Sequence, residues 1–65
     1  MTAADALTAS IDADVYVGTP EGESYITTGC YVNRNGRRYA EIKLSNHTSI
    51  SVPADEAINV VRIDY

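Results

Sequence analysis

The sequence predicts a small, mainly β domain, and two observations support this. Apolar residues alternate with polar ones along most of the chain, which is the pattern of strands with one buried face. Glycine, proline and asparagine interrupt the alternation at short intervals, as they do in turns. A chain of 65 residues has room for one core and hides only about 60% of the surface that its unfolded form exposes. We therefore expect one domain at 1–65, with its β part at 11–65.

The alternation delimits five short strands, which we expect to form one antiparallel sheet. A break at 18–22, where proline and glycine are spaced as in a type I turn, separates the first strand from the second. Pro53 ends the fourth strand, because proline donates no hydrogen bond to a ladder. Residues 53–57 then suit one helical or 3₁₀ turn, with acids where the helix dipole favours them. The expected strands are 11–17, 25–32, 38–45, 48–52 and 59–65.

Residues 2–9 precede the sheet and are rich in alanine. Two outcomes are open for this segment, a short helix or a frayed end, because isolated helices of this length are marginal in water. The first strand is expected to start directly after it, with Ile11 on the apolar face.

The stretch YVNRNGRRY carries the most specific turn signal in the chain. A two-residue loop at Asn35-Gly36 would place Cys30 opposite Glu41. A charged side chain would then lie on the apolar face of the hairpin, and a one-residue slip exchanges the two faces of a strand. This pattern argues against the two-residue loop.

A three-residue loop at Arg34-Asn35-Gly36 separates the two faces. It closes with the glycine in the left-handed region as a bulge, and it pairs Cys30 with Ala40. The cysteine then belongs to the apolar face as a small buried residue. The sequence therefore predicts the three-residue loop.

Charge is distributed unevenly along the chain, which has a formal net charge of −4. Residues 1–33 contain five acids and no Lys or Arg, whereas four of the five basic residues fall within 34–43. An acidic balance argues against tight binding of nucleic acid, because Lys and Arg contacts to phosphate supply most of that affinity. We expect the partner to be a protein.

The acidic residues predict one candidate binding surface. Gathered on one side, they would mimic a row of phosphates and occupy the nucleic-acid groove of another protein. In size and charge the chain resembles phage-encoded inhibitors of bacterial defence systems, including anti-CRISPR and anti-restriction proteins. The resemblance implies a partner that handles nucleic acid, a DNA mimic's role and no enzymatic activity. The residues of this surface are Asp12, Asp14, Glu21, Glu23, Asp55, Glu56 and Asp64.

The predicted hairpin offers an alternative surface for nucleic acid or protein. The three-residue register puts Tyr31 opposite Tyr39 on the outer face, with Arg34 in the loop and Arg37 at its base. Tyrosines beside arginines suit the binding of bases or of a partner's side chains. The simpler interpretation is a stabilising aromatic pair with solvated arginines that prevent edge pairing.

At the level of topology, five short strands with one helical turn before the last resemble the small SH3-like and Sm-like barrels. The resemblance covers residues 11–65 and rests on no residue motif, so it implies an architecture and no functional residue. An open antiparallel sheet with a short helix would give the same pattern.

The sequence contains no pattern that predicts catalysis, a metal or a cofactor. Cys30 and His47 are the only residues of their kinds, so neither a disulfide nor a zinc site forms within one chain. Serines beside His47 are adjacent in sequence only, which means little for a nucleophile and its base. We expect no enzyme, no metal and no cofactor.

The start of the chain shows no basic segment followed by an apolar run, and no segment approaches the roughly 20 apolar residues that span a bilayer. We therefore expect a cytoplasmic protein without a membrane partner, as a monomer or a small homo-oligomer.

Overall fold

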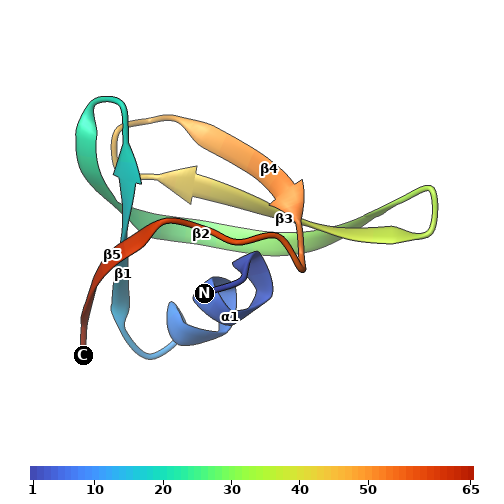
Figure 1. The fold of residues 1–65 in the computed structure, drawn as a ribbon, viewed down its shortest axis with the longest axis horizontal. Coiled ribbons are helices and arrows are strands. Elements are labelled where there is room, and N and C mark those ends of the chain that lie inside the picture. The colour runs from blue at the N-terminus through green and yellow to red at the C-terminus, as the bar shows by residue number, and fades with distance from the viewer.

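The computed structural model describes residues 1–65, which form one helix and one antiparallel sheet of five strands (Figure 1). The strands follow one another in the order β4-β3-β2-β1-β5 across the sheet. This confirms the mainly β fold that the alternation predicts. The elements are α1 (Ala3–Ala9), β1 (Asp14–Thr19), β2 (Gly22–Arg34), β3 (Arg37–Leu44), β4 (Ser49–Pro53) and β5 (Val60–Asp64).

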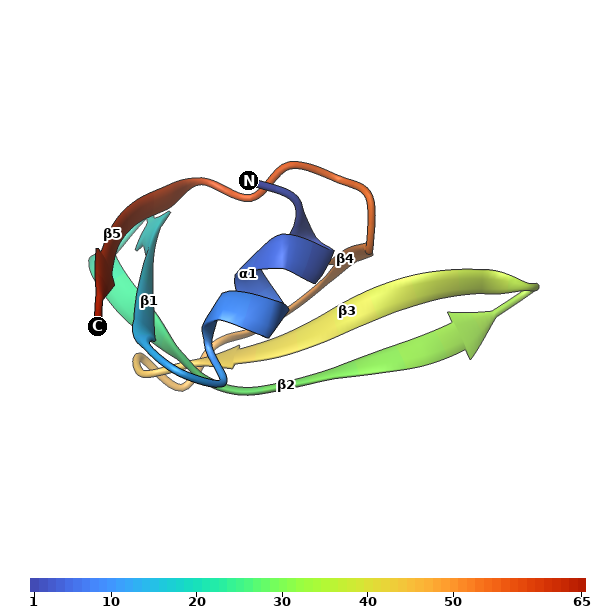
Figure 2. The ribbon, with the colours of Figure 1, turned by 90° about the horizontal axis from the view of Figure 1, so that it is seen from below.

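The sheet curves around α1, which lies on its concave side (Figure 2). β4 and β5 are the two edge strands and do not pair with each other, so the sheet stays open between them. The β2–β3 hairpin is longer than its neighbours and continues past the helix, which makes the molecule 32 Å long and 17 Å thick.

The core lies between α1 and the concave side of the sheet. Val15 and Ile42 are the largest side chains that are fully buried. Alternation places them on one side of the sheet, because successive side chains of a strand point to opposite faces. The core residues are Ala3, Ala6, Leu7, Val15, Val17, Ile26, Ala40, Ile42 and Leu44.

The N-terminal segment forms a helix rather than a frayed end. The Thr2 hydroxyl accepts a hydrogen bond from the Asp5 N–H and caps the first turn. Seven residues are too few for a stable isolated helix, so burial of its alanines and Leu7 stabilises it. The N–H groups of Ala3 and Ala4 also donate to carbonyls of the β4–β5 connection, at 2.8 and 2.9 Å. At this length α1 cannot cross a membrane, and the structure has no other helix.

The first strand begins later than the sequence predicts. Turn-like hydrogen bonds continue after α1, from the Ile11 N–H to the Thr8 carbonyl and from the Asp12 N–H to the Ala9 carbonyl. Ile11 therefore lies in the connection and is 80% exposed. The expectation that it belongs to the apolar face of a strand is wrong.

The hairpin turn has two residues, so the predicted three-residue loop is wrong. Asn35 and Gly36 both have positive φ angles, 52° and 76°, and Arg34 pairs directly with Arg37. Two successive positive φ angles are the signature of the type I′ turn, for which Asn-Gly is the preferred sequence.

A β-bulge explains why the register test failed. At the base of the hairpin Ile26 pairs with Leu44, as predicted. The next pair is Thr28 with Lys43, so β2 contains one extra residue at Thr27. The bulge shifts the inward positions of β2 by one, because side chains alternate with a period of two.

Beyond the bulge, the faces of β2 are the reverse of those predicted. Cys30 pairs with Glu41 on the outer face and is exposed, so the expected buried cysteine is wrong. Tyr31 pairs with Ala40 on the side of the helix, and not with Tyr39 as predicted. As a result of this reversal, the position of β2 that faces α1 is a glycine, Gly29.

Gly29 lets α1 approach the sheet closely. A Cβ atom at this position would lie 2.0 Å from Cδ2 of Leu7, so no larger residue fits without a shift of that side chain. Two positions further along, the Tyr31 hydroxyl donates a 3.0 Å hydrogen bond to the carbonyl of Ala4. The strand therefore approaches the helix closely at Gly29, which has no side chain, and contacts it through the long side chain of Tyr31.

The remaining turns fall where the sequence places them. Pro53 starts a single turn that is closed by a 3.0 Å hydrogen bond from the Glu56 N–H to the Pro53 carbonyl. The β3–β4 turn contains His47, which is exposed and has a φ angle of 67°.

Candidate functional site

The most distinctive surface is the free end of the β2–β3 hairpin, residues 31–39, which we call the arm. It extends beyond α1 and the rest of the sheet (Figure 2). The arm contains three of the five basic residues and no acid. The rest of the chain, which we call the body, holds two basic and nine acidic residues, a formal charge of −7. The molecule is therefore an acidic body with a cationic projection.

Arg34 lies on the outer face of the arm. Its Nη2 atom is 2.6 Å from Oε1 of Glu41, and its guanidinium carbon is 5.9 Å from the centre of the Tyr39 ring. Both interactions restrain the side chain, although the ion pair is solvent-exposed. The ion pair also offsets the repulsion between Arg34 and Arg37, which are directly opposed.

Arg38 lies on the inner face, where its guanidinium carbon is 4.2 Å from the centre of the Tyr31 ring. This distance suits a cation–π interaction. The ring is itself anchored, because the Tyr31 hydroxyl donates to the Ala4 carbonyl. Tyr31 and Tyr39 are therefore not an aromatic pair; they stack with separate arginines on opposite faces of the arm.

The base of the arm meets the connection between β4 and β5. Tyr39 pairs with Pro53, and the Ala54 N–H donates a 3.0 Å hydrogen bond to the Arg38 carbonyl. A hollow of about 560 Å³ opens at this junction. Gly36, Arg37, Arg38, Pro53, Ala54 and Asp55 line it.

The acidic residues of the other candidate surface come together only in part. Asp14 on β1 pairs with Asp64 on β5, and both line a hollow of about 370 Å³ together with Asp12. We call these three residues the acidic edge. Ile11 and Tyr65 line the same hollow and are highly exposed. The acidic edge is thus a small cluster of carboxylates beside two apolar side chains.

An ion-pair network partly neutralises this end of the sheet. Arg62 contacts Glu23 at 3.1 Å and Asp64 at 2.9 Å, while its guanidinium carbon lies 4.0 Å from the centre of the Tyr16 ring. The Tyr25 ring lies next to Tyr16, with 5.7 Å between ring centres. The hydrogen bond that Arg62 donates to the Glu23 carboxylate raises the pKa of Arg62 above its ordinary value. Glu23 therefore differs from Asp12 and Asp14, which have no ion-pair partner.

The other predicted acids lie elsewhere. Glu21 is in the β1–β2 turn, and Asp55 and Glu56 are in the β4–β5 connection, beside the arm (Figure 1). The seven predicted residues thus occupy three separate parts of the surface.

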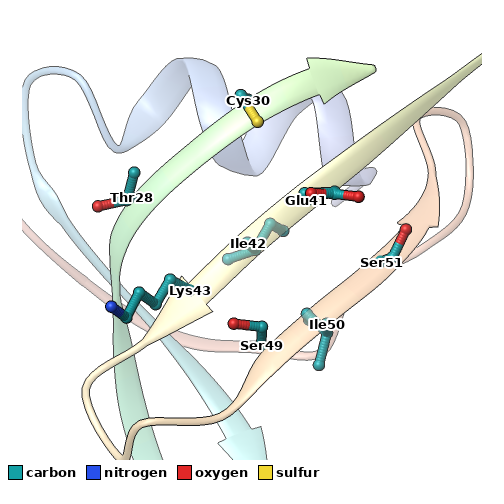
Figure 3. A pocket seen from close by; sticks show the side chains of 8 residues that line it. All are labelled: Thr28, Cys30, Glu41, Ile42, Lys43, Ser49, Ile50 and Ser51. Carbon is teal, nitrogen blue, oxygen red and sulfur yellow. The ribbon is translucent and has the colours of Figure 1, made fainter. Parts of the chain in front are cut away.

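The outer face of β2, β3 and β4 carries a further hollow of about 310 Å³ (Figure 3). Cys30, Thr28, Ser49 and Ser51 present a thiol and three hydroxyl groups there. No histidine lines it, and the carboxylate of Glu41 is already bound to Arg34. The hollow therefore groups a thiol and three hydroxyls with the side chain of Lys43.

No group of three or more His, Cys, Asp or Glu side chains has a geometry that could hold a metal ion. The three carboxylates of the acidic edge line one hollow, but they are not arranged as a group that could hold a metal ion.

Sequence reasoning missed two parts of these surfaces. The stack of Arg38 on Tyr31 was missed because the predicted register put the tyrosine on the other face. The cluster of Tyr16, Tyr25 and Arg62 had a usable signal: with Pro20-Glu21 as a two-residue turn, Tyr16 and Tyr25 fall opposite each other, as they do in the structure.

Comparisons with protein-family models, with curated proteins and with solved structures found no significant match to this chain.

Proposed function

We propose that this chain is a small non-enzymatic interaction protein that binds a protein partner through the arm. The carrying observation is the separation of charge: a projecting strand pair with three arginines on a body with a formal charge of −7. Arginine and tyrosine are the residue types that dominate binding energy in protein interfaces. Arg34 is held by an ion pair and Arg38 by a stacked ring, which reduces the conformational entropy that these side chains lose on binding.

A protein partner fits this charge distribution better than a nucleic acid does. Three arginines neutralise few phosphates, and affinity for nucleic acid rises with the number of phosphates contacted. A long nucleic acid would also extend from the arm along the acidic body, at a cost in repulsion. A protein partner with a local acidic patch can contact the arm without approaching the acidic body.

The chain's one histidine lies apart from its one cysteine. His47 lies in the exposed β3–β4 turn, and the hollow that contains Cys30 has no histidine. Nucleophilic catalysis needs a nucleophile and a base within hydrogen-bond reach. Binding is therefore the function that the exposed groups support best.

A second candidate function uses the acidic edge. Asp12, Asp14 and Asp64 line one hollow beside Ile11 and Tyr65, which supports binding to a basic protein surface. In this role the chain would act as a DNA mimic, in the manner of phage-encoded inhibitors such as anti-CRISPR proteins. The mimic hypothesis now rests on three clustered carboxylates, because the other four acids do not line this hollow, and one of the three, Asp64, is paired with Arg62.

Two matched variants separate these functions. Arg34→Gln/Arg37→Gln removes charge from the arm, and Asp12→Asn/Asp14→Asn removes it from the acidic edge. Each is tested by quantitative affinity capture from a host extract, with the captured protein identified by mass spectrometry and then remeasured with purified components.

Loss of the partner in the arm variant, with retention in the acidic-edge variant, is the expected result. The opposite result would move the binding site to the acidic edge and support the mimic. A gel-shift assay at low salt completes the test: retardation of an oligonucleotide by the chain alone would overturn the choice of a protein partner.

A further inference from the structure

We propose that the hollow at the base of the arm binds a carboxylate side chain of the partner, in an extended segment that carries a basic residue two positions away. This inference rests on the proposed function and specifies the partner's chemistry. It is carried by Arg37, Arg38 and Asp55, which line the same hollow.

Arg38 is prepared to bind an oxyanion. Its guanidinium lies over the Tyr31 ring, and the ring is anchored to the Ala4 carbonyl through its hydroxyl. Stacking covers the face of a guanidinium but leaves its N–H groups in the plane, where they can donate to a carboxylate. Arg38 has no ion pair within the chain, so these donors are free.

Arg37 supplies a second positive charge at the same hollow. Unlike Arg34, it has no acidic partner and no aromatic ring beneath it. Adjacent residues of a strand point to opposite faces, so Arg38, on the inner face, supplies the directed donors, and Arg37, on the outer face, adds positive charge at the rim of the hollow. The hollow is thus the part of the arm where positive charge is least compensated by ion pairs.

Asp55 makes the hollow selective. It lines the same surface as the two arginines, and Glu56 follows it in the chain. The Asp55 carboxylate repels a ligand with several closely spaced negative charges, such as a polyphosphate. A ligand with one oxyanion and a nearby cation satisfies both the arginines and Asp55.

An extended protein segment offers this pattern at a suitable spacing. Side chains two positions apart in an extended chain point the same way and lie about 7 Å apart. We therefore choose an acidic and a basic side chain in the order Glu-x-Lys as the occupant. Inorganic phosphate and duplex DNA are the competing ligands for the test.

The test uses two acetylated, amidated peptides, Gly-Glu-Gly-Lys-Gly and the same peptide with Gln in place of Lys. Amide chemical shifts of the full chain are followed during titration. We expect saturable shifts at residues 36–38 and 54–55, with the lysine peptide binding about tenfold more tightly than the glutamine peptide.

Three variants give the proposal its controls. Arg38→Gln should weaken binding of the lysine peptide about tenfold or more, because the oriented donors are lost. Lys43→Gln removes one positive charge outside both the arm and the hollow and should leave the affinity within about twofold. Asp55→Asn should abolish the preference for lysine over glutamine. Arg38 is exposed, and retention of the wild-type shift dispersion verifies that the variants fold.

The proposal is overturned if the peptides cause no shifts at these residues, or if Arg38→Gln binds the lysine peptide as the wild type does. Tighter binding of inorganic phosphate or duplex DNA at the same residues would also overturn it. If the native partner still requires the arm while the peptides do not bind, the proposed function stands and this inference alone fails.

Discussion

The body and the arm share the strands β2 and β3, yet different forces decide where their side chains point. In the body, Ile42 and Leu44 are buried against the helix and β1, so burial selects the inward face. The arm has no core, and its two faces carry an arginine over a tyrosine each. A bulge at Thr27, within the body, sets the register of β2 from Thr28 to the end of the arm.

This difference shows which features of a strand can be read from hydrophobic alternation. Alternation reports on burial, and therefore it predicts the register only where a core selects it. In the arm the register follows from the Asn35-Gly36 turn, whose preferred type is a local property of two residues. The prediction failed because the register at the base of the hairpin, where Ile26 pairs with Leu44, was extended past the bulge at Thr27.

The prediction with the largest expected effect compares the two faces of the β2–β3 strand pair in the body. Ile42→Ala should lower the free energy of unfolding by about 3 kcal/mol, because a fully buried side chain leaves a cavity. Cys30→Ser, on the exposed face of the neighbouring strand, should change it by less than about 0.5 kcal/mol. Denaturant unfolding of both variants measures this, and a loss of similar size at Cys30 would contradict the observed register.

Much of the fold was predictable for the same reason. The five strands are short and alternate strongly, whereas for residues 2–9 the sequence left a helix and a frayed end both open. The bulge was not predictable, since Thr27 is an ordinary strand residue and nothing nearby marks an insertion. The one sequence feature related to the bulge is Gly29. The glycine is needed because the Leu7 side chain, distant in sequence, lies close to the position of its missing Cβ.

A second prediction concerns that contact. Gly29→Ala should destabilise the protein by about 2 kcal/mol, because its Cβ would overlap with Leu7 and that buried side chain would have to shift. The effect should be specific to the inward face, so Thr28→Ala, one residue earlier and exposed, is the control. Thermal unfolding measures both. Equal stability of Gly29→Ala and wild type would show that α1 does not pack closely on β2.

A third prediction concerns the turn of the arm. Gly36 has a φ angle of 76°, and no atom lies near the position of its missing Cβ. Gly36→Val should therefore cost about 1 kcal/mol through backbone strain alone, without a steric clash. Gly36→Asn is the matched control, because asparagine tolerates this region and should cost less. Equal stabilities of the two variants in denaturant unfolding would count against the type I′ turn.

The candidate site was less predictable than the fold. The sequence identified the arginines of the arm, because three of them fall within five positions. It did not reveal that Asp55 lines the same hollow as Arg37 and Arg38, since that arrangement depends on the pairing of β3 with β4. Nor did it separate Glu23 from the other acids, because the ion pair with Arg62 requires β5 to lie next to β1.

The smallest expected effect concerns the ion pair on the outer face of the arm. Arg34 and Glu41 are 2.6 Å apart, but both side chains are about half exposed. Exposed pairs contribute roughly 0.2–1 kcal/mol, so Arg34→Gln and Glu41→Gln should each lower stability by that amount or less. A double-mutant cycle isolates the coupling between them.

The coupling should decrease from low to high salt, since exposed charges are screened. In the body, Ile42→Ala should cost the same at both salt concentrations, because its effect comes from packing. A coupling above about 2 kcal/mol, or one that salt does not change, would mean that the arm is ordered by more than surface charge.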